Sequence, residues 1–544
     1  LGVNEGKKTW GVPVQLYEQV SENNLGIGNF SDLAQIGNTL GRNGAGIMGV
    51  NPLHAMRDDY PENASPYSPD SRMFYNYIYL DVTAVKDFSE NQDIMSYYHS
   101  PEFQEKINKN RRKGYVDYAT TQELLDDILW KCYDKFSSDK KSEDYKRFCV
   151  YCDDKGEDLE KYATFRALCK VMSQQNPAPV NWHQWPKAYK NPNSPEVIKF
   201  EAENRRLINF YKYTQYQCDK QLERVQETCL SSGMKIGLYT DQSVGGSCFG
   251  FEAWYQPDLY MKASAGAPPD ILSQNGQIWN VVGFNPIKLR EKGYEPYSKI
   301  MRASMKYAGC TRIDHVLQLQ RLYMVPHGHQ AVDGAFIYYN FDELMAIVAL
   351  ESHRNKTMVI GEDLGMLPEG FRPKLEDFGI LSYRVLPFER EWGFKSGHGT
   401  NAMKHPNEYP VASVCATSTH DTPPLDCQWN VQDVYLKRKL GFISEAQAND
   451  KFEQYATQRE ALNYALTEKG CWQRVGGVPC NAPRQQAATI PDKYEQAVVD
   501  YLGQSNSAIM LLPFSDIFGT KEMGNIPGIT ELAISEKETM LDIH

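Results

Sequence analysis

Three short segments of this chain place an acidic residue directly after a run of apolar or β-branched residues. The segments are Arg312-Ile313-Asp314-His315, Gly361-Glu362-Asp363-Leu364 and Thr419-His420-Asp421-Thr422. If the runs are parallel barrel strands, the three carboxylates emerge at the carboxyl-terminal rim, where barrel enzymes build their active sites. Such a trio suits sugar chemistry, because an oxocarbenium-like transition state requires a nucleophile, an acid and nearby negative charge.

Each motif also has a purely structural interpretation. Arg312 and Asp314 are compatible with a structural ion pair, yet residues i and i+2 of a strand share a face, so both side chains could enter a barrel mouth. There the guanidinium would keep the carboxylate ionised, as a nucleophile requires. Glu362-Asp363 is equally compatible with a capped helix start, and His420-Asp421 with a turn. The catalytic interpretation therefore depends on all three motifs ending strands of one barrel.

Candidate strands occur at the spacing that a barrel requires. They lie at 12–16, 46–50, 235–239, 309–313, 358–360, 381–386 and 411–417. Helical patterns lie between several of them, including a capped helix over 30–40 that ends near Gly41 and another over 341–351. This alternation predicts parallel βαβ units and hence an α/β fold, a (β/α)8 TIM barrel.

Two long connections predict insertions into a single catalytic barrel that spans residues 1–544. Residues 85–230 are charged and amphipathic, with Thr120-x-x-Glu123 as a capping box, and predict an inserted helical subdomain. Residues 245–292 are rich in Gly, Pro and aromatic residues and predict a loop or lid region over the active site.

Composition disfavours several classes of partner. The 544 residues include 58 Lys and Arg against 69 Asp and Glu, a net charge of −11, and no basic stripe that could neutralise nucleic acid. No apolar run reaches membrane-helix length, and the first residues lack the basic and apolar parts of a signal peptide. We therefore expect a cytoplasmic protein without a membrane or nucleic-acid partner, and, because the sequence begins with Leu, we expect residues before Leu1.

The twelve cysteines lie at irregular spacings. Cys149 and Cys152 form a C-x-x-C pair, but no second pair completes a zinc site. We interpret the cysteines as reduced thiols, and no motif indicates a metal or an organic cofactor. Neither composition nor motifs indicate an oligomeric state.

The order and content of the motifs resemble those of the 4-α-glucanotransferases, also called amylomaltases or disproportionating enzymes, a branch of the α-amylase clan. The matching segments are Gly11-Val-Pro-Val-Gln-Leu-Tyr17, Leu25-Gly-Ile-Gly28, Asn51-Pro-Leu-His54, Ser65-Pro-Tyr-Ser-Pro69, Gly266-Ala-Pro-Pro-Asp270, Gly276-Gln-Ile-Trp279, Arg312-Ile-Asp-His315, Gly361-Glu-Asp-Leu-Gly365 and Thr419-His-Asp421. The details are most similar to the longer bacterial maltodextrin-pathway enzymes, without their amino-terminal region.

The resemblance implies catalytic roles. Asp314 matches the nucleophile, Glu362 the general acid/base and Asp421 the carboxylate that stabilises the transition state, while Arg312 is expected to orient Asp314. A retaining mechanism agrees with these roles, because it requires a nucleophile and an acid/base roughly 5 Å apart, with the pKa of the acid raised by its charged neighbour.

The resemblance also implies substrate-binding roles. His315 and His420 are expected to hydrogen-bond sugar hydroxyls near the cleaved bond. Tyr67 and Trp279 resemble aromatic platforms for glucose rings, whose C–H faces stack on aromatic rings. Packing in the core or in a lid is the alternative for either aromatic residue.

Three further positions keep their alternatives open. Asp241 and Asp270 either bind hydroxyl groups or terminate a strand and a turn. Asn525-Ile-Pro-Gly528 resembles a carboxyl-terminal family segment, but the family usually continues with Thr and then Asn-Trp and basic residues, whereas this chain continues Ile529-Thr-Glu-Leu. No acceptor-side contact is therefore assigned to that end of the barrel.

Together these features predict an enzyme that transfers α-1,4-glucan segments through a covalent glycosyl-enzyme, with maltooligosaccharides and α-glucans as donor and acceptor. If water replaces the acceptor, the outcome is an α-glucan hydrolase. Two other classes remain open. One is a metal-dependent barrel hydrolase that uses the three carboxylates and the two histidines as ligands, and the other is a glucan-binding protein without turnover.

Overall fold

The computed structural model describes residues 7–61, 63–269, 275–391, 402–472 and 490–520. The chain divides into two compact units. Unit 1 comprises Leu1–Val14, Asn43–Gly49 and Val359–Ile529, and unit 2 comprises Gln15–Arg42, Val50–Met358 and Thr530–His544. The predicted catalytic residues are distributed over both, because Asp314 belongs to unit 2 whereas Glu362 and Asp421 belong to unit 1.

Eight strands close into a barrel in the order β1-β14-β13-β12-β11-β8-β5-β2. They are β1 (Thr9–Val14), β2 (Ile47–Val50), β5 (Gly237–Gln242), β8 (Cys310–Ile313), β11 (Met358–Gly361), β12 (Leu381–Val385), β13 (Ser413–Ala416) and β14 (Ile509–Leu511). The pairs β1/β14, β14/β13, β13/β12, β12/β11 and β8/β5 are parallel. The predicted (β/α)8 fold is confirmed.

The barrel strand that the sequence analysis missed is β14. It pairs with β1 on one side and with β13 on the other. Its signal is the apolar run 508–512, which ends at Pro513 and is of the same kind as the runs that predicted the other strands.

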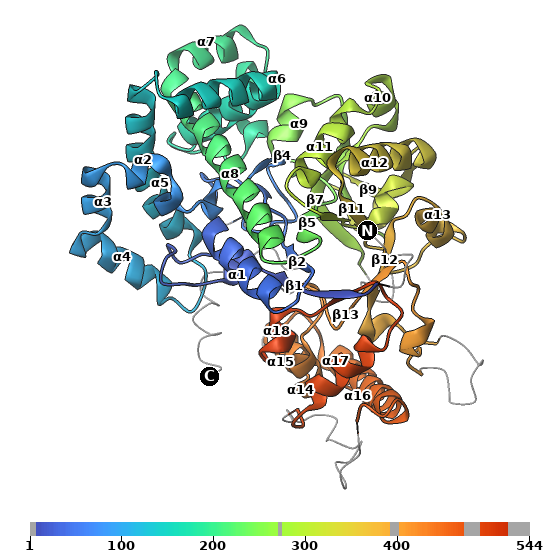
Figure 1. Ribbon diagram of the computed structural model, residues 1–544. Coiled ribbons are helices and arrows are strands. Elements are labelled where there is room, and N and C mark those ends of the chain that lie inside the picture. The colour runs from blue at the N-terminus through green and yellow to red at the C-terminus, as the bar shows by residue number, and fades with distance from the viewer. Residues whose placement is uncertain (1–6, 62, 270–274, 392–401, 473–489, 521–544) are drawn as a thin grey trace. The chain divides into compact units, whose positions relative to one another are not determined.

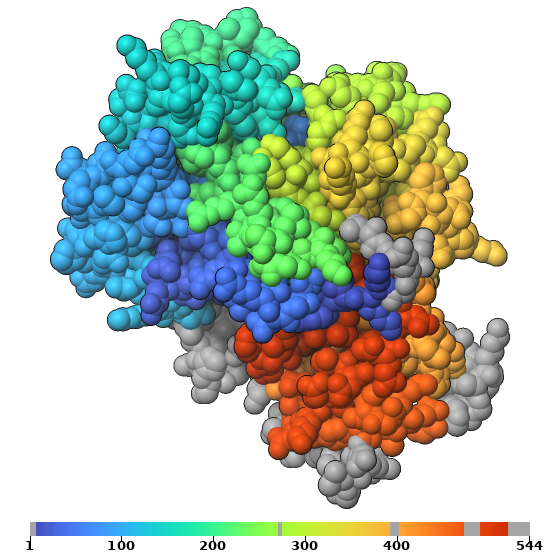
Figure 2. Space-filling model, viewed as in Figure 1, coloured from blue at the N-terminus to red at the C-terminus, as the bar shows by residue number. Residues whose placement is uncertain are grey.

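Unit 1 contains a group of helices beside β13 and one helix, over 371–377, that packs against β12. Its helices are α13 (Phe371–Asp377), α14 (Leu425–Asn430), α15 (Gln432–Lys439), α16 (Glu445–Glu468), α17 (Tyr494–Gly503) and α18 (Phe514–Ile517). Cys415 of β13 shares an apolar core with Trp429, Leu466 and Tyr501. Helices α14 to α18, orange and red in Figure 1, form one continuous group of side chains in Figure 2.

Unit 2 contains most of the helices. They are α1 (Phe30–Arg42), α2 (Lys86–Ser89), α3 (Gln92–Tyr98), α4 (Pro101–Arg111), α5 (Tyr118–Ser138), α6 (Glu143–Met172), α7 (Pro195–Glu203), α8 (Arg205–Ser231), α9 (Phe251–Tyr255), α10 (Pro286–Glu291), α11 (Glu295–Met305) and α12 (Phe341–Asn355). The two helices predicted over 30–40 and 341–351 are α1 and α12. The long helix α8 packs on both α1 and α6 (Figure 1). No helix in the described ranges is both long and apolar enough to cross a membrane.

The segment 245–292 is not the loop that its composition suggested. It contains β6 (Tyr260–Ala267) and β7 (Gln277–Phe284), which join β9 (Arg321–Pro326) and β10 (Ala335–Tyr338) in a sheet of order β10-β9-β6-β7. The small residues that resemble loop composition serve close packing, because a Cβ on Gly266 would lie 2.1 Å from the carbonyl oxygen of Gln277. A separate antiparallel pair, β3 (His54–Ala55) and β4 (Ser71–Tyr75), completes the strands of unit 2.

The predicted capping box at Thr120 is also wrong. Helix α5 begins at Tyr118, and its cap is Asp117, whose carboxylate accepts a hydrogen bond from the Thr120 backbone N–H at 2.9 Å. Thr120 lies inside the first turn. An acidic N-cap accepts a hydrogen bond from an otherwise unpaired N–H group, and its negative charge interacts favourably with the positive end of the helix dipole.

We expect Gly309→Ala to destabilise the strand that carries Arg312. A Cβ on Gly309 would lie 1.9 Å from the backbone oxygen of Ile236, so a methyl group forces the backbone apart at a cost of about 3 kcal/mol or more. Differential scanning fluorimetry should show a large fall in apparent Tm. Gly503→Ala is the matched control, because its Cβ would meet nothing within 4 Å; equal Tm values for the two variants would contradict the expectation.

Candidate active site

Arg312 in β8 bridges two carboxylates of unit 2. Its Nη2 lies 2.8 Å from Asp314 Oδ1, and its Nη1 donates to both carboxylate oxygens of Asp241, at 2.7 and 2.9 Å. The expected contact between Arg312 and Asp314 is therefore present. Asp241 is directly opposite Arg312 in the parallel ladder of β5 and β8, which explains why one guanidinium reaches both acidic groups.

The pairing with Asp241 and Asp314 stabilises the positive charge of Arg312. Burial works against the charged form, but Asp241 and Asp314 outweigh it and raise the pKa of the guanidinium well above its ordinary value. Tyr67 adds a further contact, because its hydroxyl donates to Asp241 Oδ2 at 2.9 Å. Asp241 thus belongs to a network with Tyr67 and Arg312, and the sequence analysis did not predict this connection.

His315 follows the strand end in a left-handed conformation, with φ 45°. Burial, with a smaller effect of Arg321, lowers the pKa of its imidazole to about 4, so the ring is neutral near neutral pH. The ring centroid lies 5.4 Å from that of Trp279 in an edge-on arrangement. Trp279 is half-buried and donates its indole N–H to Gln277 at 2.8 Å. The structure therefore brings both predicted binding residues together.

His54 braces the strand end that carries Asp241. Its Nε2 accepts a hydrogen bond of 3.4 Å from the backbone N–H of Ser243. Burial, together with the positive charge of Arg72, lowers the pKa of His54 to about 3, although Glu252 acts in the opposite direction. The Arg72–Glu252 pair is itself buried, at 2.8 Å.

In unit 1, the adjacent acidic residues after β11 have different environments. Asp363 is fully buried and accepts hydrogen bonds from the Ser382 hydroxyl at 2.6 Å and the Tyr383 N–H at 2.8 Å, with Arg372 Nε at 2.6 Å. Glu362 is only half-buried, and its Oε1 accepts from the Leu364 N–H at 2.8 Å. The pair does not begin a helix. Asp363 is a structural carboxylate, and Glu362 is the one that partly faces solvent.

His420 and Asp421 lie in a turn that follows β13. The turn is closed by a 3.2 Å hydrogen bond from the Thr422 N–H to the Thr419 carbonyl oxygen. His420 Nε2 lies 3.0 Å from Asp421 Oδ2, and the Asp421 side chain is 52% exposed. The turn interpretation is therefore correct locally, and it leaves Asp421 accessible from solvent.

Asp516 is a structural residue near this turn that the sequence analysis missed. Its buried carboxylate accepts from the hydroxyls of Thr417 and Ser418, the latter at 2.7 Å, and from the Leu425 N–H at 2.7 Å. It thus ties together both ends of the segment that carries Asp421. Burial raises the pKa of this carboxylate. The rule that identified the other acidic residues, a carboxylate after an apolar run, would have found it once β14 was recognised.

Some predicted features lie elsewhere. Asp270 and the segment 525–528 are outside the described residues. Among the described residues, no group of three or more His, Cys, Asp or Glu side chains is arranged to hold a metal ion.

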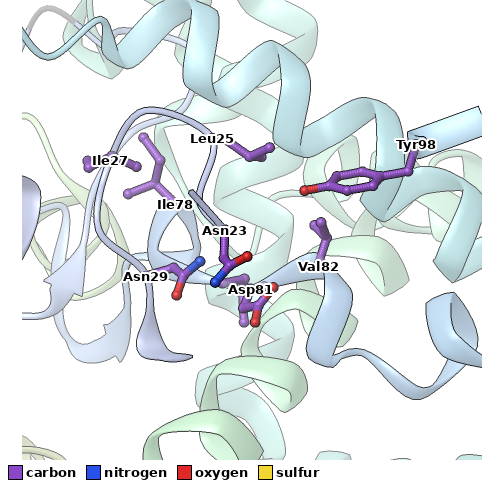
Figure 3. A pocket seen from close by; sticks show the side chains of 9 residues that line it. Asn23, Leu25, Ile27, Asn29, Ile78, Asp81, Val82 and Tyr98 are labelled. Atoms are coloured by element: carbon purple, nitrogen blue, oxygen red, sulfur yellow. The ribbon is translucent and has the colours of Figure 1, made fainter. Parts of the chain in front are cut away.

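A small pocket beside the loop 23–29 contains none of the predicted site residues (Figure 3). Its carboxylate, Asp81, accepts from the Ser31 hydroxyl at 2.5 Å and from Thr83. The protein itself therefore satisfies the charged group of this pocket, which gives no reason to place the chemistry there.

The fold and these residues define a (β/α)8 barrel enzyme with carboxylates at its strand ends. The family model described as 4-alpha-glucanotransferase matches residues 14–533. The chain belongs to this family, as the motifs indicated.

Individual relatives agree with this assignment. A 4-alpha-glucanotransferase of Haemophilus influenzae is 34% identical over 533 residues, covering 96% of this chain and 74% of that protein. One from Mycobacterium bovis is 29% identical over 551 residues, covering 97% and 70%.

Two solved structures share the fold. An amylomaltase from Corynebacterium glutamicum has a TM-score of 0.82 and 23% identity, covering 97% of this chain and 70% of that chain. An amylomaltase from Streptococcus agalactiae in complex with acarbose has a TM-score of 0.74 and 17% identity, covering 96% and 94%.

The neutral His54 predicts a particular dependence of stability on pH. Its pKa is about 3 in the folded protein against about 6.5 when unfolded. Its contribution is therefore complete above pH 6.5 and is lost as the pH falls toward 3, amounting to about 2 kcal/mol between pH 7 and pH 5. His54→Gln keeps an acceptor for Ser243 but does not titrate.

The apparent Tm of the parent should consequently fall more steeply than that of His54→Gln between pH 7 and pH 5. Other shifted groups, including His315, are present in both proteins and cancel in the comparison. Parallel slopes would show that folding does not lower the pKa of His54.

Proposed function

We propose that this protein transfers α-1,4-glucan segments between maltodextrins by a retaining, double-displacement mechanism. The observation that carries the proposal is the Arg312–Asp314 ion pair at the end of β8, in a chain that belongs to the 4-alpha-glucanotransferase family. Glu362 and Asp421 likewise follow strands of the closed barrel. We further propose maltooligosaccharides and α-glucans as both donors and acceptors, and a cytoplasmic location.

In the first displacement, Asp314 attacks the anomeric carbon and forms a glycosyl ester. Arg312 favours the ionised form of Asp314, which a nucleophile requires. Glu362 donates its proton to the departing glycosidic oxygen, so the leaving sugar departs as an alcohol. Because Glu362 is half-buried, its carboxylate can contact a substrate. The carboxylate of Asp363 is fully buried and cannot.

In the second displacement, Glu362 removes the proton from an acceptor hydroxyl, which attacks the same carbon and releases Asp314. A sugar acceptor completes transfer, and water gives hydrolysis. Asp421 stabilises the positive charge of each oxocarbenium-like transition state, while His315 and His420 hydrogen-bond sugar hydroxyls.

The remaining predicted residues are proposed to position the sugar. Tyr67 and Trp279 offer half-buried ring faces for stacking, and Asp241 and Asp270 are proposed to bind hydroxyls. We also propose that residues 85–230 form a helical insertion and that 245–292 cover the site, as the contact between Trp279 and His315 supports.

Maltotriose as the only substrate distinguishes transfer from the alternatives. We expect glucose together with a ladder of longer maltodextrins, resolved by size, because a sugar hydroxyl captures the intermediate. Only shorter sugars would indicate a hydrolase. Activity lost on chelation would indicate a metal-dependent enzyme, and tight binding without products would indicate a glucan-binding protein.

Two variants separate the catalytic carboxylates. Asp314→Asn should lose activity by several orders of magnitude with every donor, because no covalent intermediate forms. Glu362→Gln should be severely impaired with maltodextrins but should still react with α-glucosyl fluoride, whose leaving group does not require protonation.

Mass spectrometry of the intact protein provides the decisive measurement. Glu362→Gln should accumulate an added glucosyl mass from the fluoride, since the second step lacks its base, and Asp314→Asn should show none. If Glu362→Gln loses both donors equally and traps nothing, Glu362 is a binding or structural residue. Asp363→Asn is the control, expected to reduce stability rather than to discriminate between donors.

A further inference from the structure

The loop that carries Tyr67 connects β3 to β4 and is held at both ends. We call residues 56–70, apart from residue 62, the Tyr67 loop. Tyr67 lies within a turn closed by a 3.1 Å hydrogen bond from the Ser68 N–H to the Ser65 carbonyl oxygen. Its hydroxyl donates to Asp241 at 2.9 Å, so the position of this loop determines one contact of the carboxylate that Arg312 shares with Asp314.

A single buried arginine contacts both ends of the Tyr67 loop. Arg166 belongs to α6, and its side chain is 0% exposed. Its Nη2 donates to Asp58 and lies 3.4 Å from Asp59, while its Nη1 lies 3.2 Å from Asp70 Oδ2. Asp58 and Asp59 are near the start of the loop and Asp70 is at its end.

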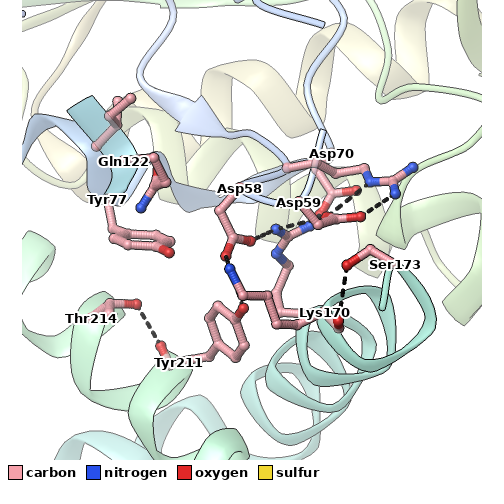
Figure 4. Close-up of polar contacts among 12 residues, drawn as sticks. Asp58, Asp59, Asp70, Tyr77, Gln122, Lys170, Ser173, Tyr211 and Thr214 are labelled. Atoms are coloured by element: carbon pink, nitrogen blue, oxygen red, sulfur yellow. Dashed lines mark hydrogen bonds and ion pairs between the residues drawn. The ribbon is translucent and has the colours of Figure 1, made fainter. Parts of the chain in front are cut away.

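Other groups of unit 2 complete this cluster. Tyr211 of α8 donates its hydroxyl to Asp58 at 2.9 Å, and Arg57 pairs with Asp59. Figure 4 shows the three aspartates gathered beside the helix that carries Lys170. The aspartate side chains are at most 2% exposed, and burial raises the pKa of Asp70 to about 8. Removal of Arg166 would therefore leave buried acidic groups without the hydrogen-bond donor that they share, which is costly whether those groups are charged or neutral.

The end of the loop is also fixed by backbone contacts. The Phe251 N–H donates to the Asp70 carbonyl oxygen at 2.9 Å, and the Ser247 N–H donates to the Pro69 carbonyl oxygen at 2.6 Å. Gly250 permits this approach, because a Cβ there would lie 2.6 Å from the Asp70 carbonyl oxygen. Arg166 therefore links the start of the loop, at Asp58 and Asp59, to an end whose position is already fixed by backbone hydrogen bonds.

We infer that Arg166 is a positioning residue for the catalytic carboxylate. By clamping both ends of the Tyr67 loop, it places the Tyr67 hydroxyl on Asp241, which in turn fixes Arg312 against Asp314. The inference rests on the proposed function of Asp314. It assigns to the helical region 85–230 a role in the geometry of the reaction, through a residue that does not touch the substrate.

Arg166→Lys tests this inference while retaining the positive charge. A lysine ammonium is a single point of contact and cannot hold two separate carboxylates as a planar guanidinium does. We expect kcat for maltotriose disproportionation to fall roughly 10- to 100-fold with KM little changed, because the reacting groups are misplaced rather than removed. Lys161→Met is the control on the same helix, since the Lys161 ammonium pairs with Glu201 at 3.0 Å and donates to the Pro192 carbonyl oxygen at 2.9 Å, both of which lie outside the Tyr67 loop.

If Arg166 acts through Tyr67, the effects of the two substitutions on kcat should not be independent. Tyr67→Phe removes only the hydroxyl, so Arg166→Lys should reduce kcat little further when it is added to Tyr67→Phe. Asp70→Asn, which weakens the other end of the clamp, should give the same pattern and replaces Arg166→Lys if that variant does not fold. All assays are run well below each variant's apparent Tm.

Two outcomes would overturn the inference. One is a kcat for Arg166→Lys equal to that of Lys161→Met, and the other is a double variant in which the two effects multiply independently. Asp314→Asn is measured in the same series. If it retains activity, the proposed function fails; if it is inactive while Arg166→Lys resembles the control, only the role of Arg166 fails.

Discussion

One guanidinium held between two carboxylates is the interaction on which the unit 2 part of this site depends. Arg312 is buried, and an unpaired charge in that position would be strongly unfavourable. Asp241 and Asp314 together stabilise it and also constrain each other, because neither can move without disturbing the other's partner. The close packing of β8 against β5 is required for this arrangement, which explains why a glycine precedes the strand at residue 309.

The two adjacent acidic residues after β11, Glu362 and Asp363, have different roles because their side chains have different surroundings. The Asp363 carboxylate accepts hydrogen bonds from two residues of β12, Ser382 and Tyr383. Glu362 is thereby left at a fixed place with a partly accessible carboxylate. In the same unit, Asp516 orders the segment around Asp421 although it is separated from it by about a hundred residues in sequence. Buried carboxylates thus provide the rigid support that accessible ones need for catalysis.

The barrel and its acidic strand ends could be predicted because both produce local signals. Short apolar runs followed by polar residues identified all the barrel strands but β14, and residue spacing alone placed Arg312 beside Asp314. The network around Tyr67 could not be predicted, because its contacts join residues far apart in sequence. Composition wrongly predicted a loop over 245–292, where the small residues allow close packing of strands. The motif at Thr120 wrongly predicted the start of a helix, because Asp117, three residues earlier, is the N-cap.

The separation of partners along the chain also constrains when this region can become ordered. Arg166 meets Asp58 across 108 residues, and Tyr67 meets Asp241 across 174. As the chain emerges from the ribosome, the Tyr67 loop must wait for the whole of α6 and then for β5 before its contacts exist. Non-local contacts of this kind are acquired late and slowly. The β3–β4 connection, although it is synthesised early, is therefore expected to gain protection from proteolysis only after β5 has been made.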